Sequence, residues 1–175
     1  MTNRKTALLR SAALVAIAAL TVFMSSCGLL TARLGDTKPK EFSKAGLSIT
    51  LDDSFTEEEM LAFTAYYQTS RCFVSTIKEE FSLFEDAGIS TDIPLDDYAQ
   101  MVMENSSITP LITYKGVEKS GFTFNNEANG KKYFYYATVR KGTDAFWLIQ
   151  FCCADTDKTD FFPRFESWAD TIKVD

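Results

Sequence analysis

Histidine does not occur in this chain of 175 residues. Its absence excludes Ser–His–Asp and Cys–His catalysis, together with zinc sites that contain His. Basic residues are fewer than acidic ones: the chain has 18 Lys and Arg and 24 Asp and Glu, which gives a net charge of −6. Nucleic-acid binding needs a basic surface to neutralise phosphates and is therefore disfavoured. Four Cys in a chain of this length are also too few for a disulfide scaffold.

Aromatic residues are abundant by comparison. Fifteen Phe, seven Tyr and two Trp accompany a hydrophobic content of 46% and a charged content of 24%. This composition is ordinary for a globular protein and provides enough apolar mass for a packed core, so disorder is not expected. The length corresponds to about one domain on a scale of ~150 residues per domain.

The first 26 residues have the organisation of a secretory signal peptide. Three basic residues precede an apolar run at 11–23, which is shorter than the ~20 residues that span a membrane. The run leads into Met24-Ser-Ser-Cys27. This segment resembles a bacterial lipobox, in which the Cys is diacylated and becomes the mature N-terminus, although lipoboxes favour Leu where this chain has Met24. The alternative is an ordinary signal peptide that is cut near an unrelated Cys27.

Lipidation at Cys27 would leave a strongly acidic mature protein. Fifteen Lys and Arg and all 24 Asp and Glu follow Cys27, so the mature side chains carry a charge of −9. An anionic membrane repels such a body, and acyl chains on Cys27 must hold it there, since each buried CH₂ contributes ~0.8 kcal/mol. Residues 27–44 lack sustained periodicity and are predicted to form a flexible tether, which leaves residues 45–175 as the folded domain.

The folded domain is predicted to be α+β. Apolar patterns predict strands at 46–51, 63–69, 72–81, 111–114, 117–124, 132–140 and 145–153. Helices are expected at 95–105 and from Thr159 or Asp160 to about Thr171, with one or two helical turns at 56–59. The last strand is apolar on both faces, which requires a covering layer on each side. We therefore predict an antiparallel sheet sandwiched by helices.

Three segments of this domain resemble the PsbP-like family. They are Gly46–Leu51 with the acidic turn and Phe55 that follow it, Leu95–Ala99, and Ala145–Phe151 with the closing segment Phe162–Val174. The resemblance covers about residues 44–175, and its motifs are structural. It implies a three-layer αβα sandwich, shared with the Ran-binding nuclear-import factor and with many bacterial surface lipoproteins. It also implies action through protein partners without known enzymatic activity, but no partner-binding motif matches.

Three cysteines, Cys72, Cys152 and Cys153, lie within predicted strands. Adjacent strand residues point to opposite faces, so a disulfide between Cys152 and Cys153 would need a distorted turn. We interpret all three as buried free thiols, because they occupy apolar strands. The alternative is a disulfide from Cys72 to one of the other two, which requires their strands to be neighbours.

Four acidic residues, Asp155, Asp157, Asp160 and Glu166, loosely match the spacing of a calcium loop. The Gly that such a loop requires at its sixth position is missing. We interpret these residues as loop carboxylates and a helix cap, and we expect no metal and no cofactor. A second acidic group at 52–59 is interpreted as solvated, because nothing apolar lies close enough in sequence to shift a carboxyl pKa.

Tyr133, Tyr135 and Tyr136 belong to one predicted strand and alternate across it. Exposed tyrosines could stack on sugar rings or contact a partner. We favour a place in the core, because helices on both sides of the sheet need apolar partners.

These observations favour a lipid-anchored domain on the extracytoplasmic face of a bacterial cell membrane. Its predicted role is non-enzymatic binding of a protein or cell-envelope ligand. One alternative is a carboxylate-dependent hydrolase, which would need a cleft holding two acids with shifted pKa values. Another is a structural component of an envelope complex, which would expose a large apolar patch.

Overall fold

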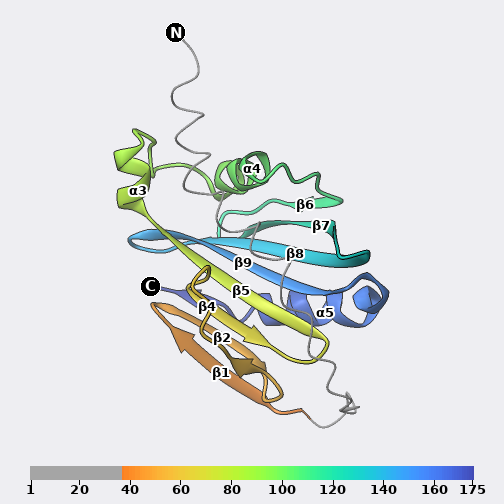
Figure 1. Cartoon of the computed structure of the whole chain (residues 1–175). Coiled ribbons are helices and arrows are strands. Elements are labelled where there is room, and N and C mark those ends of the chain that lie inside the picture. The colour runs from red at the N-terminus through yellow and green to blue at the C-terminus, as the bar shows by residue number, and fades with distance from the viewer. Residues whose placement is uncertain (1–36) are drawn as a thin grey trace.

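The computed structural model describes residues 37–175, which form two antiparallel sheets and the helices that pack on them (Figure 1). The proposed signal peptide, Cys27 and most of the predicted tether lie outside the described residues. The strands are β1 (Pro39–Lys44), β2 (Leu47–Asp52), β3 (Thr56–Glu57), β4 (Ala65–Gln68), β5 (Cys72–Glu80), β6 (Ile112–Tyr114), β7 (Ser120–Ala128), β8 (Lys131–Lys141), β9 (Ala145–Ala154) and β10 (Lys173–Val174). The helices are α3 (Phe81–Asp86), α4 (Leu95–Asn105) and α5 (Lys158–Ala169), the last preceded by the 3-10 turn η2 (Asp155–Asp157).

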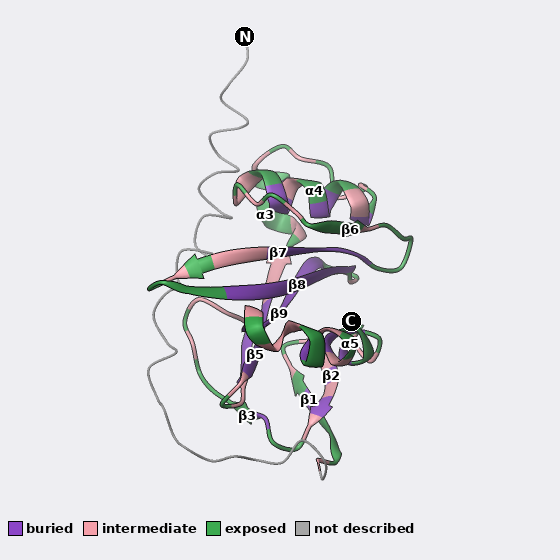
Figure 2. Cartoon of the chain, turned by 90° about the vertical axis from the view of Figure 1, so that its right-hand side faces the viewer, coloured by how far each residue is buried: buried purple, intermediate pink, exposed green. Residues whose placement is uncertain are grey.

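The seven-stranded sheet forms the middle layer. Its strand order is β3-β4-β5-β9-β8-β7-β6, and the smaller sheet has the order β1-β2-β10. Helix α4 packs on β7 and β8, whereas α5 packs on β8, β9 and β2. The two helices therefore cover opposite faces of the large sheet (Figure 2), which we call the α4 face and the α5 face. This arrangement confirms the predicted α+β class.

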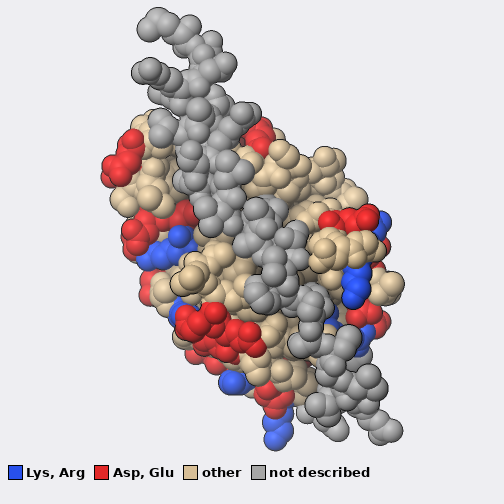
Figure 3. Space-filling view, in the orientation of Figure 1, with Lys and Arg blue, Asp and Glu red and all other residues tan. Residues whose placement is uncertain are grey.

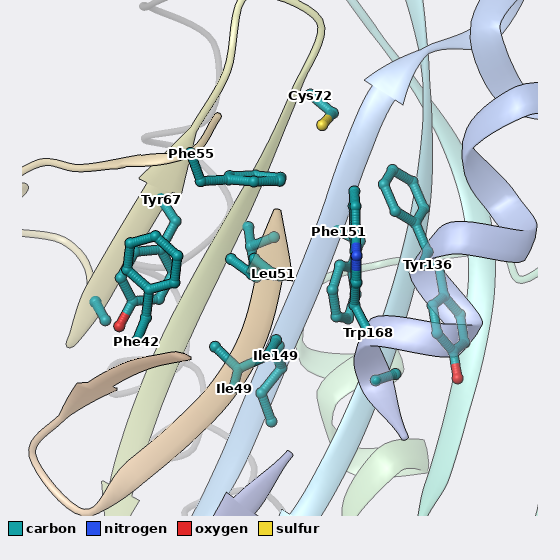
Figure 4. Packing of buried hydrophobic residues seen from close by; sticks show 14 of the residues in the cluster. Phe42, Ile49, Leu51, Phe55, Tyr67, Cys72, Tyr136, Ile149, Phe151 and Trp168 are labelled. Carbon is teal, nitrogen blue, oxygen red and sulfur yellow. The ribbon is translucent and has the colours of Figure 1, made fainter. Parts of the chain in front are cut away.

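Strand β9 lies at the centre of the sheet and is buried on both faces. Trp147, Ile149 and Phe151 point into the cluster on the α5 face, and Phe146 and Leu148 point into the cluster on the α4 face. The close view in Figure 4 shows side chains from β2, β9 and α5 meeting in the first of these clusters. Complete burial of each such side chain stabilises the fold by about 1.5–3 kcal/mol. The two-sided apolar pattern of this strand is the reason that both faces need a cover.

Helix α4 has the bounds that the sequence predicts. Its first turn carries Asp96 and Asp97, which complement the positive end of the helix dipole, and Tyr98 and Val102 are buried on its inner side. Within residues 37–175, no helix is long and apolar enough to cross a membrane.

Two N-terminal predictions are wrong. Residues 39–44 are not part of a tether, because they form β1 and pair with β2 from Pro39 to Lys44, with Phe42 buried beneath. The ordered domain therefore begins before residue 45. Residues 56–59 are not helical, because Thr56 and Glu57 pair with β4 instead. Strand pairing at the sheet edge prevails here, because a local helix-start pattern stabilises a helix little unless that helix packs on another element.

Two further boundaries differ from the prediction. The strand predicted at 72–81 gives way to α3 at Phe81, where burial of Phe84 anchors a short helix. The strand predicted at 117–124 begins only at Ser120 and continues to Ala128. It then turns through Asn129 and Gly130, whose φ angles of 52° and 70° suit the tight turn between two antiparallel strands. Because this strand begins at Ser120 rather than at residue 117, Val117 lies in a loop.

Replacement of a β9 core residue tests this description. Phe151 is fully buried between β5, β8 and α5, with its ring 5.4 Å from that of Phe165. We expect Phe151→Ala to lower the free energy of unfolding by about 3–5 kcal/mol, because it removes buried contacts and leaves a cavity. Urea denaturation measures the change. Leu83→Ala, at an exposed helix position, is the control and should shift stability by less than about 0.5 kcal/mol; similar losses in the two variants would contradict the proposed core.

Candidate binding site

Three of the four acidic residues that match a calcium loop form ion pairs. Arg71 lies 3.1 Å from Asp157 and 3.6 Å from Asp160, and Lys132 lies 3.6 Å from Asp155. Within residues 37–175, no group of three or more His, Cys, Asp or Glu side chains is arranged to hold a metal ion. Figure 3 shows acidic side chains lying beside basic ones on the visible face. These carboxylates connect the η2–α5 segment to β5 and β8.

The fourth residue of that pattern, Glu166, is exposed on α5. The three tyrosines are buried, which confirms their interpretation as core residues. Tyr133 and Tyr135 lie on the α4 face, where the Tyr135 ring stacks on Phe124 at 4.7 Å. Tyr136 lies on the α5 face. Both rings are buried, so neither presents an open platform to a ligand, and desolvation by this burial raises the pKa of each hydroxyl.

The three described cysteines are free and buried, as interpreted from the sequence. Burial raises the pKa of the Cys72 and Cys153 thiols to about 12 and that of Cys152 well above its ordinary value. A thiolate is the reactive form of cysteine, so these groups are poor nucleophiles in the folded protein.

The second acidic group is also engaged by partners. Lys44 lies 2.9 Å from Glu57 and 2.6 Å from Glu59, and Arg164 lies 3.4 Å from Asp52. The hydrogen bonds from Lys44 to Glu59 and Glu57 raise the pKa of Lys44. The other two acids accept hydrogen bonds, Asp53 from the backbone N–H of Lys38 and Glu58 from the side-chain amide of Gln68. Each carboxylate therefore has a donor or a cation as its partner, and the group does not have the arrangement of a carboxylate pair that shares a proton.

One carboxyl differs from the others in its surroundings. Glu79 is half-buried on the α4 face and accepts a hydrogen bond of 2.8 Å from the hydroxyl of Tyr98 on α4. Desolvation raises the pKa of Glu79, and the hydrogen bond partly offsets the shift. The partner is a tyrosine rather than a second carboxylate, so this pair connects α4 to β5 and lacks the second acid of a hydrolase.

A groove opens between α4 and the end of the sheet. It has a volume of about 370 Å³ and is lined by Gln100, Met103 and Glu104 of α4, by the 107–110 segment and by Thr113 of β6. Its lining is mixed, because Met103, Ile108 and Pro110 are apolar and the other lining residues are polar. The groove runs beside β6, which, among residues 37–175, is hydrogen-bonded to a neighbouring strand on one side only.

The segment that contains β6 is rich in exposed apolar side chains, which lie on both faces of the sheet because Ile112 and the groove-lining Thr113 are adjacent strand residues. Five large hydrophobic side chains are exposed within residues 37–175, and three of them, Leu111, Ile112 and Val117, fall in one short segment around β6. Leu111 and Ile112 are each 53% exposed and Val117 is 97% exposed. We call these three residues, with the groove, the β6 surface. Exposed apolar side chains along an open strand edge are a feature of protein-binding surfaces.

The groove carries negative potential at the end of α4. Glu104 is its charged lining residue and accepts a hydrogen bond of 2.8 Å from Gln100. The last turn of α4 contains no basic residue, so the partial negative charge of the helix C-terminus is not offset within the helix. A positively charged side chain would therefore be favoured there.

The loop that carries Val117 is held at both ends. The backbone N–H of Gly116 donates to Asp96 at 3.4 Å, and the Ser120 hydroxyl donates to the carbonyl of Tyr114 at 2.8 Å. Lys119 forms an ion pair with Asp170 at the end of α5. Val117 therefore projects from an anchored loop, and its exposure is a property of the fold.

Sequence reasoning did not find this surface. It predicted strands at 111–114 and 117–124, which would have placed most of these side chains within the sheet. The charged residues on both sides of Val117 were a usable signal, because Lys115, Glu118 and Lys119 do not fit a buried strand. Nothing local to Ile112 shows that its strand lies at the sheet edge.

Comparison with known proteins finds the fold without sequence similarity. No protein-family model and no curated protein matches the sequence. The Ran-binding protein Mog1p of Saccharomyces cerevisiae superposes with a TM-score of 0.56 at 10% identity, over 79% of this chain and 96% of Mog1p. Cyanobacterial PsbP from Synechocystis gives a TM-score of 0.47 at 12% identity, over 86% of this chain and 98% of PsbP. LpqN of Mycobacterium tuberculosis, which is involved in cell envelope biogenesis, gives a TM-score of 0.47 at 10% identity, over 79% of this chain and 90% of LpqN.

These likenesses show the fold alone. At that level the likeness to Mog1p agrees with the predicted resemblance, which implied a fold shared with a Ran-binding protein.

The Glu79–Tyr98 contact predicts a pH dependence of stability. Because the pKa of Glu79 is raised in the folded state, the folded protein holds this proton more tightly than the unfolded chain. Stability from this group is present at acidic pH, below the unfolded pKa, and is lost as the pH rises through the folded value. Glu79→Gln keeps an acceptor for Tyr98 and removes the charge. We expect the variant to gain up to about 1 kcal/mol over the wild type at pH 7 and to lose that advantage under acidic conditions.

Urea denaturation at neutral and acidic pH measures this difference. Glu80→Gln, at the exposed neighbouring position, is the matched control and should track the wild type at every pH. A Glu79→Gln advantage that does not change with pH would contradict a titrating Glu79.

Proposed function

We propose that this protein is a lipid-anchored, extracytoplasmic binding domain that holds a protein partner on its β6 surface and catalyses no reaction. The observation that carries the proposal is the exposure of Leu111, Ile112 and Val117 within one segment, at an open strand edge that borders a groove. Mog1p, which has this fold, is a Ran-binding protein, so the same architecture supports protein recognition elsewhere.

The surface fits an extended segment of the partner. Strand β6 pairs with β7 on one side, and the backbone groups on its other side can hydrogen-bond to an added strand. Apolar side chains of that segment would cover Leu111 and Ile112. A Lys or Arg would find favourable potential beside Glu104 at the negative end of α4. The partner segment is therefore expected to be extended, apolar and basic at one position.

Charge placed on the β6 surface tests this role. A tagged chain is expressed in its bacterial host, cross-linked on intact cells and purified, and its cross-linked partners are quantified by mass spectrometry. We expect the Ile112→Asp, Val117→Asp double variant to recover a given partner at least about tenfold less, because a buried carboxylate at a contact costs more than 1.4 kcal/mol. The Leu61→Asp, Leu83→Asp variant is matched in charge and exposure and should behave as the wild type.

Two outcomes would contradict the β6 surface as the binding site. One is an equal loss of partner in both double variants, and the other is full recovery by the Ile112→Asp, Val117→Asp variant. Thermal unfolding of each purified variant separates a loss of binding from a loss of folding, since exposed positions should change stability little.

The proposed anchor is tested at Cys27. We expect the mature wild-type chain to lack residues 1–26 and to carry an added diacylglycerol on Cys27, and to fractionate with membranes. Cys27→Ala should abolish the lipid and release the protein from the membrane, because the acidic body has no attraction to anionic lipid. Intact mass and membrane fractionation report the outcome. A wild-type chain cut elsewhere, with an unmodified Cys27, would rule out the lipid anchor while leaving the β6 surface to its own test.

A further inference from the structure

Two buried cysteines face each other across the central strands. The register of the antiparallel pair β5–β9 sets Cys72 directly opposite Cys153. Residues that are directly opposite point to the same face, and both side chains belong to the cluster on the α5 face. Figure 4 shows the Cys72 side chain within this cluster, close to the end of β5. Cys152 lies on the α4 face instead.

The position of Cys72 and Cys153 in the β5–β9 ladder determines the distance between their Cα atoms. The backbone N–H of Phe81 donates to the carbonyl of Asp144 at 2.8 Å, and these residues continue the β5–β9 register by one step. Opposite residues alternate between hydrogen-bonded and non-hydrogen-bonded pairs, so the regular register makes Cys72–Cys153 a non-hydrogen-bonded pair. The Cα atoms of such pairs are about 4.5 Å apart, within the range of about 4.4–6.8 Å that a disulfide spans.

Both residues carry free thiols in this structure, which is the reduced form of the pair. We propose that Cys72 and Cys153 form a cross-strand disulfide when the protein folds in an oxidising compartment. The two thiols lose two protons and two electrons as the S–S bond forms. A small-molecule or protein disulfide, such as oxidised glutathione, accepts them and leaves as two thiols. Cys152 takes no part, because its side chain points away from the pair.

Because both sulfurs are buried in the folded protein, the disulfide forms during folding. Cys72 is 1% exposed and Cys153 is fully buried, and the Cys72 sulfur lies 3.4 Å from the Thr69 hydroxyl. An oxidant cannot reach either sulfur once β5, β9 and α5 have packed. The bond therefore forms while the strands are still accessible, and the folded protein then shields it from reductants. It joins residues about 80 positions apart in the sequence, which is a large loop for a cross-link to close.

The test uses the mature protein purified from a secreting bacterial host. The protein is unfolded with reductant, refolded with a mixture of reduced and oxidised glutathione, and its remaining thiols are alkylated in denaturant. We expect a mass about 2 Da below that of the fully reduced form before alkylation, since two hydrogens leave. Tryptic digestion should then yield the peptide 72–78 joined to the peptide 142–158. Cys27 lies on neither peptide.

Single variants identify the sulfur that pairs with Cys72. Cys152→Ala should keep the linked peptides, whereas Cys153→Ala should lose them. Reduction of the unfolded wild type before refolding without oxidant should lower the melting temperature by roughly 10 °C, because the cross-link no longer restricts the unfolded chain. Cys152→Ala should show the same dependence on oxidant.

Three alkylated thiols in the wild type after oxidative refolding would overturn the proposal. So would a linkage that survives Cys153→Ala and disappears in Cys152→Ala. Peptide mapping of the wild type decides the question even if a variant fails to fold. The result does not depend on the β6 surface, so failure here and failure of the proposed function can be told apart.

Discussion

The two-sided burial of β9 is the constraint on which the rest of the structure depends. A strand that is apolar on both faces cannot lie at an edge or face water, so β5 and β8 must flank it and a layer must cover each face. Helix α4 covers one face and α5 the other, and the small β1-β2-β10 sheet completes the second cover through Ile49 and Leu51. The C-terminal helix and the N-terminal strands thus share one core. Damage to that core should be felt across the whole domain rather than in one element.

The edge strands differ in how strongly they discourage pairing with a further strand. At one end, β3 consists of two residues, and its Glu57 is paired with Lys44, so it offers little surface for another strand. The outer strand β1 carries Pro39 and Lys40, residue types that discourage further pairing. At the other end, β6 has no charged side chain and presents Ile112 to solvent. This contrast between the edges supports the proposed role of the β6 surface as a docking site.

The parts of the fold that are predictable from sequence are those in which a local pattern agrees with the packing. Strand β9 and helix α4 each carry a continuous apolar signal, and Asn129-Gly130 has the backbone freedom that its turn needs. Strand β1 was missed because Phe42 is its one buried side chain, and β3 because a helix-start pattern conflicts with edge pairing. The β6 surface was missed for a different reason. The exposure of Ile112 depends on the order of the strands, which is a long-range property, and only Val117 had a local signal.

The position of β1 also changes the reach of the proposed anchor. Because the folded domain starts at Pro39, the chain between Cys27 and the first strand is six residues shorter than the predicted tether. Six residues of extended chain correspond to about 20 Å, so the domain would be held that much nearer to the membrane. The acidic body is repelled by anionic lipid, whereas a short tether limits how far it can retreat. A partner for the β6 surface would then be found close to the membrane, among proteins that are themselves anchored or embedded there, and its binding segment would supply the positive charge that Glu104 and the end of α4 favour.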